Sequence, residues 1–445
     1  MKIPEKAPDF SQITPEDFGR IFALMENEEL RSLIRRANKN YLYWDKFKYR
    51  VPEKLLNGYL AWFLLKLSRK NQLRFISSTD KQNKPFNFWL PDPVQEDLHH
   101  LDSVAGGNIS FGESLINKDS QERYLVHSLM EEAISSSLLE GAATTREKAR
   151  GMLLSGKKPA SLADKMILNN YLTVKKLSSI KGEVFSRELL NEIHGTITQE
   201  TLKNPDASGR FRNESDDPIE VMDGQGNTLF VPPPVGEIEK RVDELIQFAN
   251  ADDEPGEFIH PIIRGVMLHF LLGYIHPFVD GNGRTARAIF YWYMLKRGYW
   301  LIEYIPISRI FLKSPVQYAR AYLYSEMDDQ DLTYFIVYNL KALRLGFREL
   351  KAYIARKQKK VRMVTDVFRR DPDLNARQTS LIQHALRHPE MEYNIQNHKN
   401  YYSVTYQTAR TDLLDLVTRK FMEKIKRGKK FFFKLSKEID KFLEK

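Results

Sequence analysis

The chain has 445 residues, which is long enough for two or three domains with a sizeable core. Its content of 42% hydrophobic and 28% charged residues is ordinary for a soluble globular protein, and no apolar run approaches the roughly 20 residues of a membrane span. The absence of cysteine excludes disulfides, thiol catalysis and cysteine-ligated zinc, while the net charge of +10 favours polyanionic partners or simply a solvated basic surface.

The first part of the chain has the pattern of amphipathic helices. Residues 52–70 place apolar side chains at helical spacing, so we expect a helical N-terminal region over residues 1–115. Residues 86–93 and 103–110 contain Pro, Gly and Asn and predict an irregular, loop-rich connection. The opening residues have no apolar stretch typical of a secretory signal, which favours a cytoplasmic location.

The middle of the chain is a series of helical patterns interrupted by one segment of different character. Within residues 219–231, two short β-rich runs flank the turn sequence DGQGN, which predicts a hairpin. Such a hairpin offers free strand edges onto which an extended peptide of a target protein could add. We assign residues 116–350 to this central domain.

The last part of the chain, residues 351–445, predicts a linker helix followed by a winged-helix-like domain. Residues 403–417 resemble a recognition helix, and RGKKFFFKL at residues 427–435 resembles the wing. The basic residues suit contacts to DNA phosphates, but protein contacts or formation of a homodimer would explain the same pattern. Both alternatives stay open.

The sequence HPFVDGNGRTAR, residues 276–287, concentrates polar residues between two apolar helical patterns. A turn that opens a core helix would explain its glycines but not its histidine, aspartate and arginines. A dinucleotide loop built on Gly281, Gly283 and Ala286 would need a strand before it, and the preceding residues have a helical pattern. A zinc site using His269 and His276 matches no common ligand spacing.

A nucleotide site uses every polar residue of this motif. A helix that begins at the glycines presents free N–H groups and the positive end of its dipole to an anion. Arg284 and Arg287 are three residues apart, so they share a helical face and can bind polyphosphate oxygens. Asp280 could hold Mg²⁺, and His276 could take a proton from an attacking hydroxyl.

The motif HPF-x-D-G-N-G-R-x-x-R, matched at every specified position by residues 276–287, resembles that of the Fic-domain AMP-transferases. The similarity covers about residues 120–345. It implies a mainly α fold, with a Fic helical core and a small β-hairpin flap, beside the helical N-terminal region and the C-terminal winged helix. It also implies an enzyme that uses ATP and Mg²⁺ to attach AMP to a hydroxyl side chain of a target protein.

The resemblance assigns a role to each polar residue of the motif. His276 is the expected catalytic base, and Asp280 is the expected Mg²⁺ ligand. The nucleotide-binding residues are expected to be Gly281, Asn282, Gly283, Arg284 and Arg287. Tyr318 follows the motif at a distance that suits the adenine pocket, although a helix-packing role would explain it equally well. The hairpin of residues 219–231 would be the flap on which the target docks.

A second motif lies upstream. Ser136-x-x-x-Glu140-Gly resembles the inhibitory helix, here about residues 122–141, of the Fic class with an N-terminal brake. In that class the helix glutamate pairs with the second arginine of the motif, which is Arg287 in this chain. A carboxylate on Arg287 would occupy the cation that fixes the γ-phosphate, so we expect an autoinhibited enzyme.

Two other functions remain compatible with the same residues. The site could remove AMP from a modified protein, with Glu140 orienting water and His276 protonating the leaving oxygen. Alternatively, the chain could be a DNA-binding regulator in which the Fic core only senses ATP.

Overall fold

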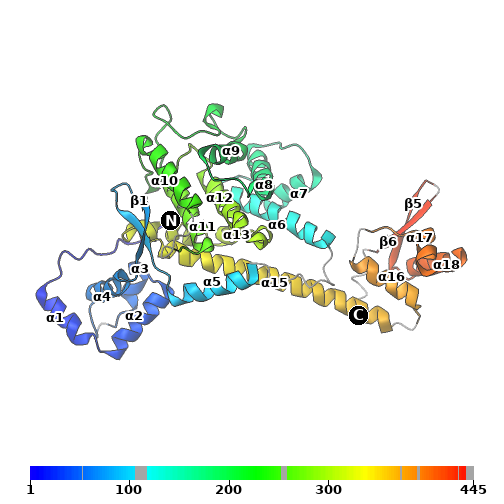
Figure 1. The fold of residues 1–445 in the computed structure, drawn as a ribbon, viewed down its shortest axis with the longest axis horizontal. Coiled ribbons are helices and arrows are strands. Elements are labelled where there is room, and N and C mark those ends of the chain that lie inside the picture. Colours follow the sequence, from blue (N-terminus) through cyan, green and yellow to red (C-terminus); the bar gives the residue numbers. More distant parts are fainter. Residues whose placement is uncertain are drawn as a thin grey trace. The chain divides into compact units, whose positions relative to one another are not determined.

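The computed structural model describes residues 1–52, 54–105, 118–251, 258–370, 373–387, 391–428 and 430–436. These parts are mainly α-helical, as the sequence predicts, and their strands form separate two-stranded antiparallel hairpins (Figure 1). None of the helices in these ranges has the length and apolar character needed to cross a bilayer.

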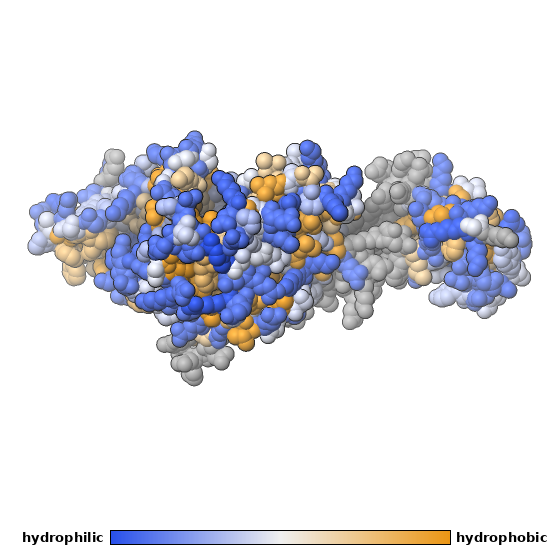
Figure 2. All heavy atoms as spheres, turned by 90° about the horizontal axis from the view of Figure 1, so that it is seen from above, coloured by the Kyte–Doolittle hydropathy of each residue, from blue (hydrophilic) through white to orange (hydrophobic). Residues whose placement is uncertain are grey.

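The chain divides into two compact units. One contains the described residues within 1–108 and 127–347, and the other contains those within 109–126 and 348–445. The predicted boundary between residues 115 and 116 lies outside the described residues, as do residues 106–110 of the loop predicted at 103–110. Residues 103–105 are helical, so that part of the prediction was wrong. The faces visible in Figure 2 are mostly hydrophilic with scattered hydrophobic patches, as expected when most large apolar side chains are buried.

The N-terminal region consists of helices with one hairpin among them. Its elements are α1 (Pro15–Leu24), α2 (Glu28–Asn40), α3 (Trp44–Phe47), η1 (Lys48–Arg50), α4 (Gly58–Lys70), β1 (Arg74–Thr79), β2 (Pro85–Phe88) and α5 (Asp92–Ala105). Helix α4 begins six residues later than the pattern at 52–70 suggests, because Asn57 caps it by accepting from the Leu60 N–H at 2.8 Å.

The prediction of an irregular connection at residues 86–93 was wrong at both ends, because residues 92 and 93 belong to α5. Residues 86–88 belong to β2, which pairs with β1 and has its last three residues buried. Asp80 closes the turn between the strands by accepting from the Gln82 and Lys84 N–H groups, both at 2.8 Å. A four-residue strand has too short a pattern to be recognised without its partner.

The central part of the chain consists mainly of helices. They are α6 (Lys118–Leu139), α7 (Arg146–Ser155), α8 (Leu162–Ile180), α9 (Arg187–Thr198), α10 (Ile238–Asn250), α11 (Pro261–Ile275), α12 (Asn282–Lys296), α13 (Ile307–Lys313), α14 (Pro315–Met327) and α15 (Thr333–Arg370). Short 3₁₀ turns η2 (Pro205–Ala207), η3 (Val235–Glu237) and η4 (Trp300–Tyr304) and strands β3 (Val221–Met222) and β4 (Thr228–Phe230) lie between them. Figure 1 shows α8, α9 and α11 gathered around α12, which is buried along nearly its whole length.

The C-terminal unit has a small core of its own. It contains α16 (Ala376–Arg387), α17 (Ile395–Tyr402), α18 (Tyr406–Thr418), β5 (Met422–Arg427) and β6 (Lys430–Leu435). Leu413 and Leu416 of α18 and Phe433 of β6 are fully buried in this core. Tyr393 adds a single bridge to β6, with backbone hydrogen bonds of 2.8 Å in both directions to Phe433.

Candidate active site

The motif forms the loop between α11 and α12 together with the first turn of α12. Helix α11 ends at Ile275, and the next residue, His276, has a left-handed φ of 49°. The loop ends at Gly281, whose φ is 83°. Glycine suits the second position because a Cβ there would come within 2.8 Å of Thr198. No side chain caps α12 at Gly281, so this helix end presents uncapped N–H groups to the loop. Because the glycines follow a helix, the dinucleotide-loop interpretation is wrong.

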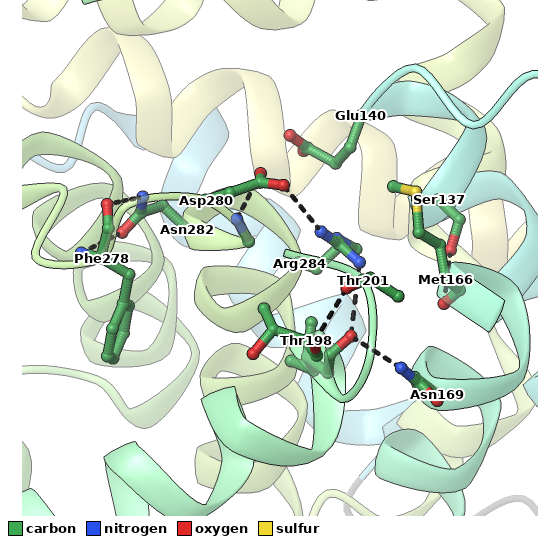
Figure 3. Close-up of polar contacts among 12 residues, drawn as sticks. Ser137, Glu140, Met166, Asn169, Thr198, Thr201, Phe278, Asp280, Asn282 and Arg284 are labelled. Carbon is green, nitrogen blue, oxygen red and sulfur yellow. Dashed lines mark hydrogen bonds and ion pairs between the residues drawn. The ribbon is translucent and has the colours of Figure 1, made fainter. Parts of the chain in front are cut away.

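Asn282 holds the loop in shape. Its Oδ1 accepts from the Phe278 N–H at 2.9 Å, and its Nδ2 donates to the Phe278 carbonyl at 2.7 Å (Figure 3). The Phe278 ring is buried and stacks on His194 of α9, with centroids 3.6 Å apart and planes 4° from parallel. The side chain of Asn282 is therefore engaged in the loop, and only its backbone is available to a ligand.

His194 ties α9 to the same loop. Its Nδ1 accepts from the Gly209 N–H at 3.0 Å, so the proton is on Nε2, which lies 2.9 Å from the Asp280 carbonyl. Burial lowers the pKa of His194 to about 4, which keeps the ring neutral. Sequence analysis did not identify this residue, because a histidine on the apolar face of a helix looks like any packed side chain.

The ring of His276 is held in the tautomer that a general base requires. Its Nδ1 lies 3.1 Å from the Gly273 carbonyl, which can only accept, so the proton is on Nδ1 and Nε2 carries a free lone pair. Burial lowers the pKa of His276 below its usual value, and the Gly273 carbonyl and the Glu140 carboxylate partly oppose this shift. The ring is therefore neutral near pH 7.

Arg212 fixes the backbone on the other side of His276. Its Nε donates to the His276 carbonyl at 2.9 Å, its backbone N–H donates to Pro277 at 2.8 Å, and its Nη2 donates to Pro233 beyond the hairpin. The side chain is buried, and burial lowers its pKa. Arg212 thus joins the loop of the motif to the segment that follows the hairpin of residues 219–231, a role that no local sequence pattern indicates.

Arg284 is a buried cation with unused donors. Its side chain has no exposed surface, and its Nη1 makes only a long bond of 3.4 Å to the Ile197 carbonyl. Among the described residues, its Nε and Nη2 have no hydrogen-bond partner, and the Asp280 carboxylate lies 3.7 Å from Nη2. Buried donors usually have partners, so this guanidinium is suited to receive an anion.

Arg287 lies one turn further along α12 and has acceptors from α6. Its Nε donates to the Ser136 hydroxyl at 2.9 Å, and its Nη2 donates to the Ser136 carbonyl at 3.1 Å. Glu140, which directly follows α6, places Oε1 2.8 Å from the same Nη2. Burial alone would lower the pKa of Arg287, but the Glu140 carboxylate raises it above its usual value.

The Glu140 carboxylate also covers the N-terminus of α12. A Cβ built on Gly283 would overlap this carboxylate, and the three atoms nearest to it all belong to Glu140. Figure 3 shows the Glu140 side chain pointing toward the side of the loop where Asp280 and Arg284 lie. One carboxylate therefore contacts both the second glycine of the motif and its last arginine.

A buried carboxylate anchors α6 in this position. Glu132 accepts from the Ser308 N–H and from the Tyr291 hydroxyl, both at 2.9 Å, and also from the Ser308 hydroxyl. Burial raises the pKa of Glu132, whereas these donors and the nearby Arg287 oppose the rise. Sequence analysis did not single out Glu132, since its partners come from α12 and α13, far away in the sequence.

Asp280 is the expected metal ligand. Its side chain is 58% exposed, and its Oδ1 accepts from the Gly281 N–H at 2.5 Å. Within the described ranges, no three potential ligands gather into a protein-only metal site. Mg²⁺ commonly uses one or two protein carboxylates and completes its shell with phosphate oxygens and water, so a single exposed carboxylate such as that of Asp280 fits this ion.

Tyr318 and His269 pack together behind the loop. The Tyr318 hydroxyl lies 2.8 Å from His269 Nε2, and its ring stacks on Phe311 at 4.5 Å. Burial raises the pKa of Tyr318, and the nearby Arg287 opposes this rise. His269 is itself 1% exposed, as expected for a packed helix residue. These contacts give Tyr318 a packing role, while its contact with adenine stays a prediction.

A lysine of the N-terminal region contacts the hairpin of residues 219–231. Strands β3 and β4 pair through Val221 with Phe230, close to the predicted bounds of the hairpin. Lys81, in the turn between β1 and β2, donates from Nζ to the Val231 carbonyl at 2.6 Å, and its ammonium lies 5.1 Å from the centre of the Phe230 ring. Its backbone N–H donates to the hydroxyl of Tyr274, two residues before His276.

Comparison with known proteins gives matches in the same region. Residues 184–294 match the Fic/DOC family. "Protein adenylyltransferase Fic" from Nematostella vectensis is 26% identical over 209 residues, which is 47% of this chain and 45% of that protein. The protein of the same name from Drosophila melanogaster is 33% identical over 87 residues, 19% of this chain and 17% of that protein. This chain thus matches less than half the length of these curated relatives.

Solved structures share the fold. A Fic family protein from Desulfovibrio desulfuricans has a TM-score of 0.51 with 19% identity, and the match covers 77% of this chain and 96% of that one. A Fic-1 segment from C. elegans has a TM-score of 0.50 with 17% identity, covering 77% of this chain and 88% of that one. Residues 184–294 are thus similar to the Fic/DOC family, and the solved structures share the fold of this chain.

Proposed function

We propose that this site transfers AMP from ATP to a Ser, Thr or Tyr hydroxyl of a target protein. The observation that supports the proposal is the buried Arg284 in the first turn of α12, whose Nε and Nη2 have no hydrogen-bond partner among the described residues, at a helix start that no side chain caps. A neutral histidine lies in the same loop, and the matched relatives are named protein adenylyltransferases. An anion site beside a general base is what nucleotide transfer needs.

In the proposed reaction, His276 Nε2 takes the proton of the target hydroxyl. The hydroxyl oxygen then forms a bond to the α-phosphorus of ATP, and the bond from that phosphorus to the oxygen bridging to the β-phosphorus breaks. Its electron pair leaves with pyrophosphate. The backbone of Gly281, Asn282 and Gly283 would hold the phosphate oxygens, and Arg284 and Arg287 would bind the β- and γ-phosphates.

Asp280 is the residue that would hold Mg²⁺ with the ATP phosphates. The bound ion would neutralise part of the phosphate charge and help to orient the polyphosphate. The flap, residues 219–231, would align the target by main-chain pairing along a strand edge, which gives affinity with little dependence on the target sequence.

We further propose that Glu140 inhibits the enzyme. Its carboxylate uses the Arg287 donor that a γ-phosphate would need, and it lies against Gly283 at the start of α12. A negative charge in that position repels phosphate and competes for the same cation. ATP would then bind weakly or with its α-phosphate turned away from the attacking hydroxyl.

The reverse activity, removal of AMP from a modified protein, uses the same two residues. The Glu140 carboxylate, whose side chain is 28% exposed, could orient a water molecule, and His276 could protonate the leaving side-chain oxygen. Incubating the wild-type protein and Mg²⁺ with an AMP-modified target, without ATP, tests this alternative. Release of AMP that depends on both Glu140 and His276 would establish it.

Incorporation of label from α-³²P-ATP into proteins of a lysate tests the forward reaction. We expect the Glu140→Gly variant to label proteins at least tenfold more than wild type, because Arg287 is free. The double variant Glu140→Gly/His276→Ala should lose this labelling. Glu147→Gly, which removes an exposed carboxylate from α7, is the matched control and should behave as wild type.

The variants separate the two parts of the proposal. Equal labelling by wild type and Glu140→Gly would disprove the inhibition by Glu140. Persistent labelling by the double variant would disprove the role of His276. Mass spectrometry of the labelled proteins identifies the target and its modified side chain.

A further inference from the structure

The C-terminal unit contains two helices joined by a tight turn, followed by a hairpin. Helix α17 ends at Tyr402, three residues form the turn, and α18 begins at Tyr406. Ser403 adopts a left-handed φ of 52°, and Thr405 caps α18 by accepting from the Thr408 N–H at 3.1 Å. This is the geometry of a helix-turn-helix, in which the second helix can enter the major groove of DNA.

The two faces of α18 differ in character. Ala409, Leu413 and Leu416 are fully buried in the core of the unit. The opposite face of the first turns is exposed, and its side chains are Tyr406, Gln407, Arg410 and Thr411. Glutamine and arginine are the side chains that pair in a bidentate manner with adenine and guanine, respectively.

The acidic residues of α18 do not lie on this exposed face. Asp412 is buried and accepts from Arg377 at 2.8 Å and from Asn375 at 2.8 Å, and it lies 3.1 Å from His398. Asp415 accepts from the Gln378 side chain at 2.8 Å. Both carboxylates are thus engaged by α16 and α17, which leaves the exposed face of α18 without negative charge.

The β5–β6 hairpin supplies further positive charge. Lys424, Lys426 and Lys430 are exposed, whereas Arg427 donates to Glu392 at 2.7 and 3.0 Å. The strands turn at Gly428, which has a φ of 61°. The acidic residue of β5, Glu423, lies 3.6 Å from Lys434 on the paired strand. A basic hairpin after a recognition helix can reach the phosphates that flank the groove.

We propose that this unit binds duplex DNA, with α18 in the major groove and the β5–β6 hairpin on the phosphate backbone. Its recognition helix has 13 residues and is therefore about 20 Å long, which suits a groove about 12 Å wide. Gln407 and Arg410 contact base edges, whereas Lys426 and Lys430 contact phosphates. DNA binding does not depend on the AMP transfer proposed above.

Fluorescence anisotropy of the full chain with a labelled duplex of about 30 base pairs, between 50 and 200 mM salt, tests the proposal. We expect affinity to fall with salt, and the Lys426→Gln/Lys430→Gln variant to lower the slope of log K against log salt by about 1 per lysine. The matched control Lys39→Gln/Lys70→Gln removes two exposed lysines from the other unit and should leave the slope unchanged.

A second variant tests base contact. Arg410→Ala should weaken binding to a duplex selected from a random pool by roughly 5- to 150-fold, while its binding to unselected DNA changes much less. Absence of salt-dependent binding, or an equal loss in the control variant, overturns the proposal. A change of oligomeric mass in Arg410→Ala by light scattering, without a change in DNA affinity, overturns it in favour of a protein contact.

Discussion

Gly283 and Glu140 are in direct contact, so their substitutions should be coupled. In a helix, Gly→Ala normally stabilises by up to about 1 kcal/mol. Here the added Cβ would displace the Glu140 carboxylate from its 2.8 Å contact with Arg287. We expect Gly283→Ala to lower Tm in the wild type but to be neutral or stabilising in the Glu140→Gly background.

A double-mutant cycle of thermal unfolding measures this coupling. The matched control is Gly151→Ala in α7, where a Cβ meets nothing within 4 Å and the effect should be the same in both backgrounds. An equal loss of Tm for Gly283→Ala with and without Glu140 would mean that this carboxylate does not occupy the start of α12.

The protonation of His276 sets the acid limb of the pH profile. A base must be neutral to accept a proton, so activity falls as pH drops through its pKa, and burial places that pKa below the usual value of about 6.5. Since Glu140 raises the pKa of His276, the activity of the Glu140→Gly variant should fall only at a still lower pH. Plotting kcat/KM of that variant from pH 5 to 8 tests this expectation.

Circular dichroism across the same range controls for acid unfolding. Protonating His194, whose pKa burial lowers to about 4, would remove the Nδ1 lone pair that accepts from Gly209. The prediction fails if the limb lies above pH 6.5 while the fold stays intact.

Sequence analysis identified the residues that lie together in one short motif. It missed those whose contacts are distant in the sequence. His276, Asp280, Arg284 and Arg287 lie within twelve residues, so one motif specifies them together. Arg212 acts through carbonyls of residues 233 and 276, and no pattern near it indicates those contacts. Such roles become visible only when the chain is folded.

The same distinction holds for whole elements. Helices α11 and α12 follow from long apolar patterns and from the proline and glycines at their starts. The hairpin at 219–231 follows from its turn sequence, whereas β2 has four residues and depends on pairing with β1. Short strands owe their existence to a partner, and a single sequence does not specify that partner.

A contact from the turn between β1 and β2 should stabilise the strand pairing of the flap. A two-stranded hairpin is marginal by itself, and the Lys81 ammonium bonds to the carbonyl that follows β4. We expect Lys81→Ala to increase hydrogen exchange at residues 228–231 about tenfold, with ATP affinity in the Glu140→Gly background unchanged. The neighbouring Lys84→Ala removes an exposed amine from the same turn and serves as control. Exchange as slow as in wild type would show that the flap is stable without this contact.

The N-terminal helices and the helices around the motif, α8 to α14, belong to one compact unit, so they should unfold together. Arg69 of α4 is completely buried, and it donates to Tyr334 of α15 at 2.9 Å and to the Leu42 carbonyl at 3.0 Å. Its charge also acts on the buried carboxyls of Asp328 and Asp331. Removing one partner of such a buried network typically costs about 3–5 kcal/mol.

Arg69→Ala should therefore lower the Tm of helices α8 to α14 as well as that of the N-terminal region. Hydrogen exchange should lose protection in α12 and α4 together, because the lost contacts join helices from both regions. Lys70→Ala removes the next cation of α4, which is exposed, and should leave both unchanged. If α4 loses protection while α12 keeps it, the N-terminal helices form an independent domain, as the predicted boundary at residue 115 implies. The buried cluster around Arg69 would then not contribute to the stability of the active site.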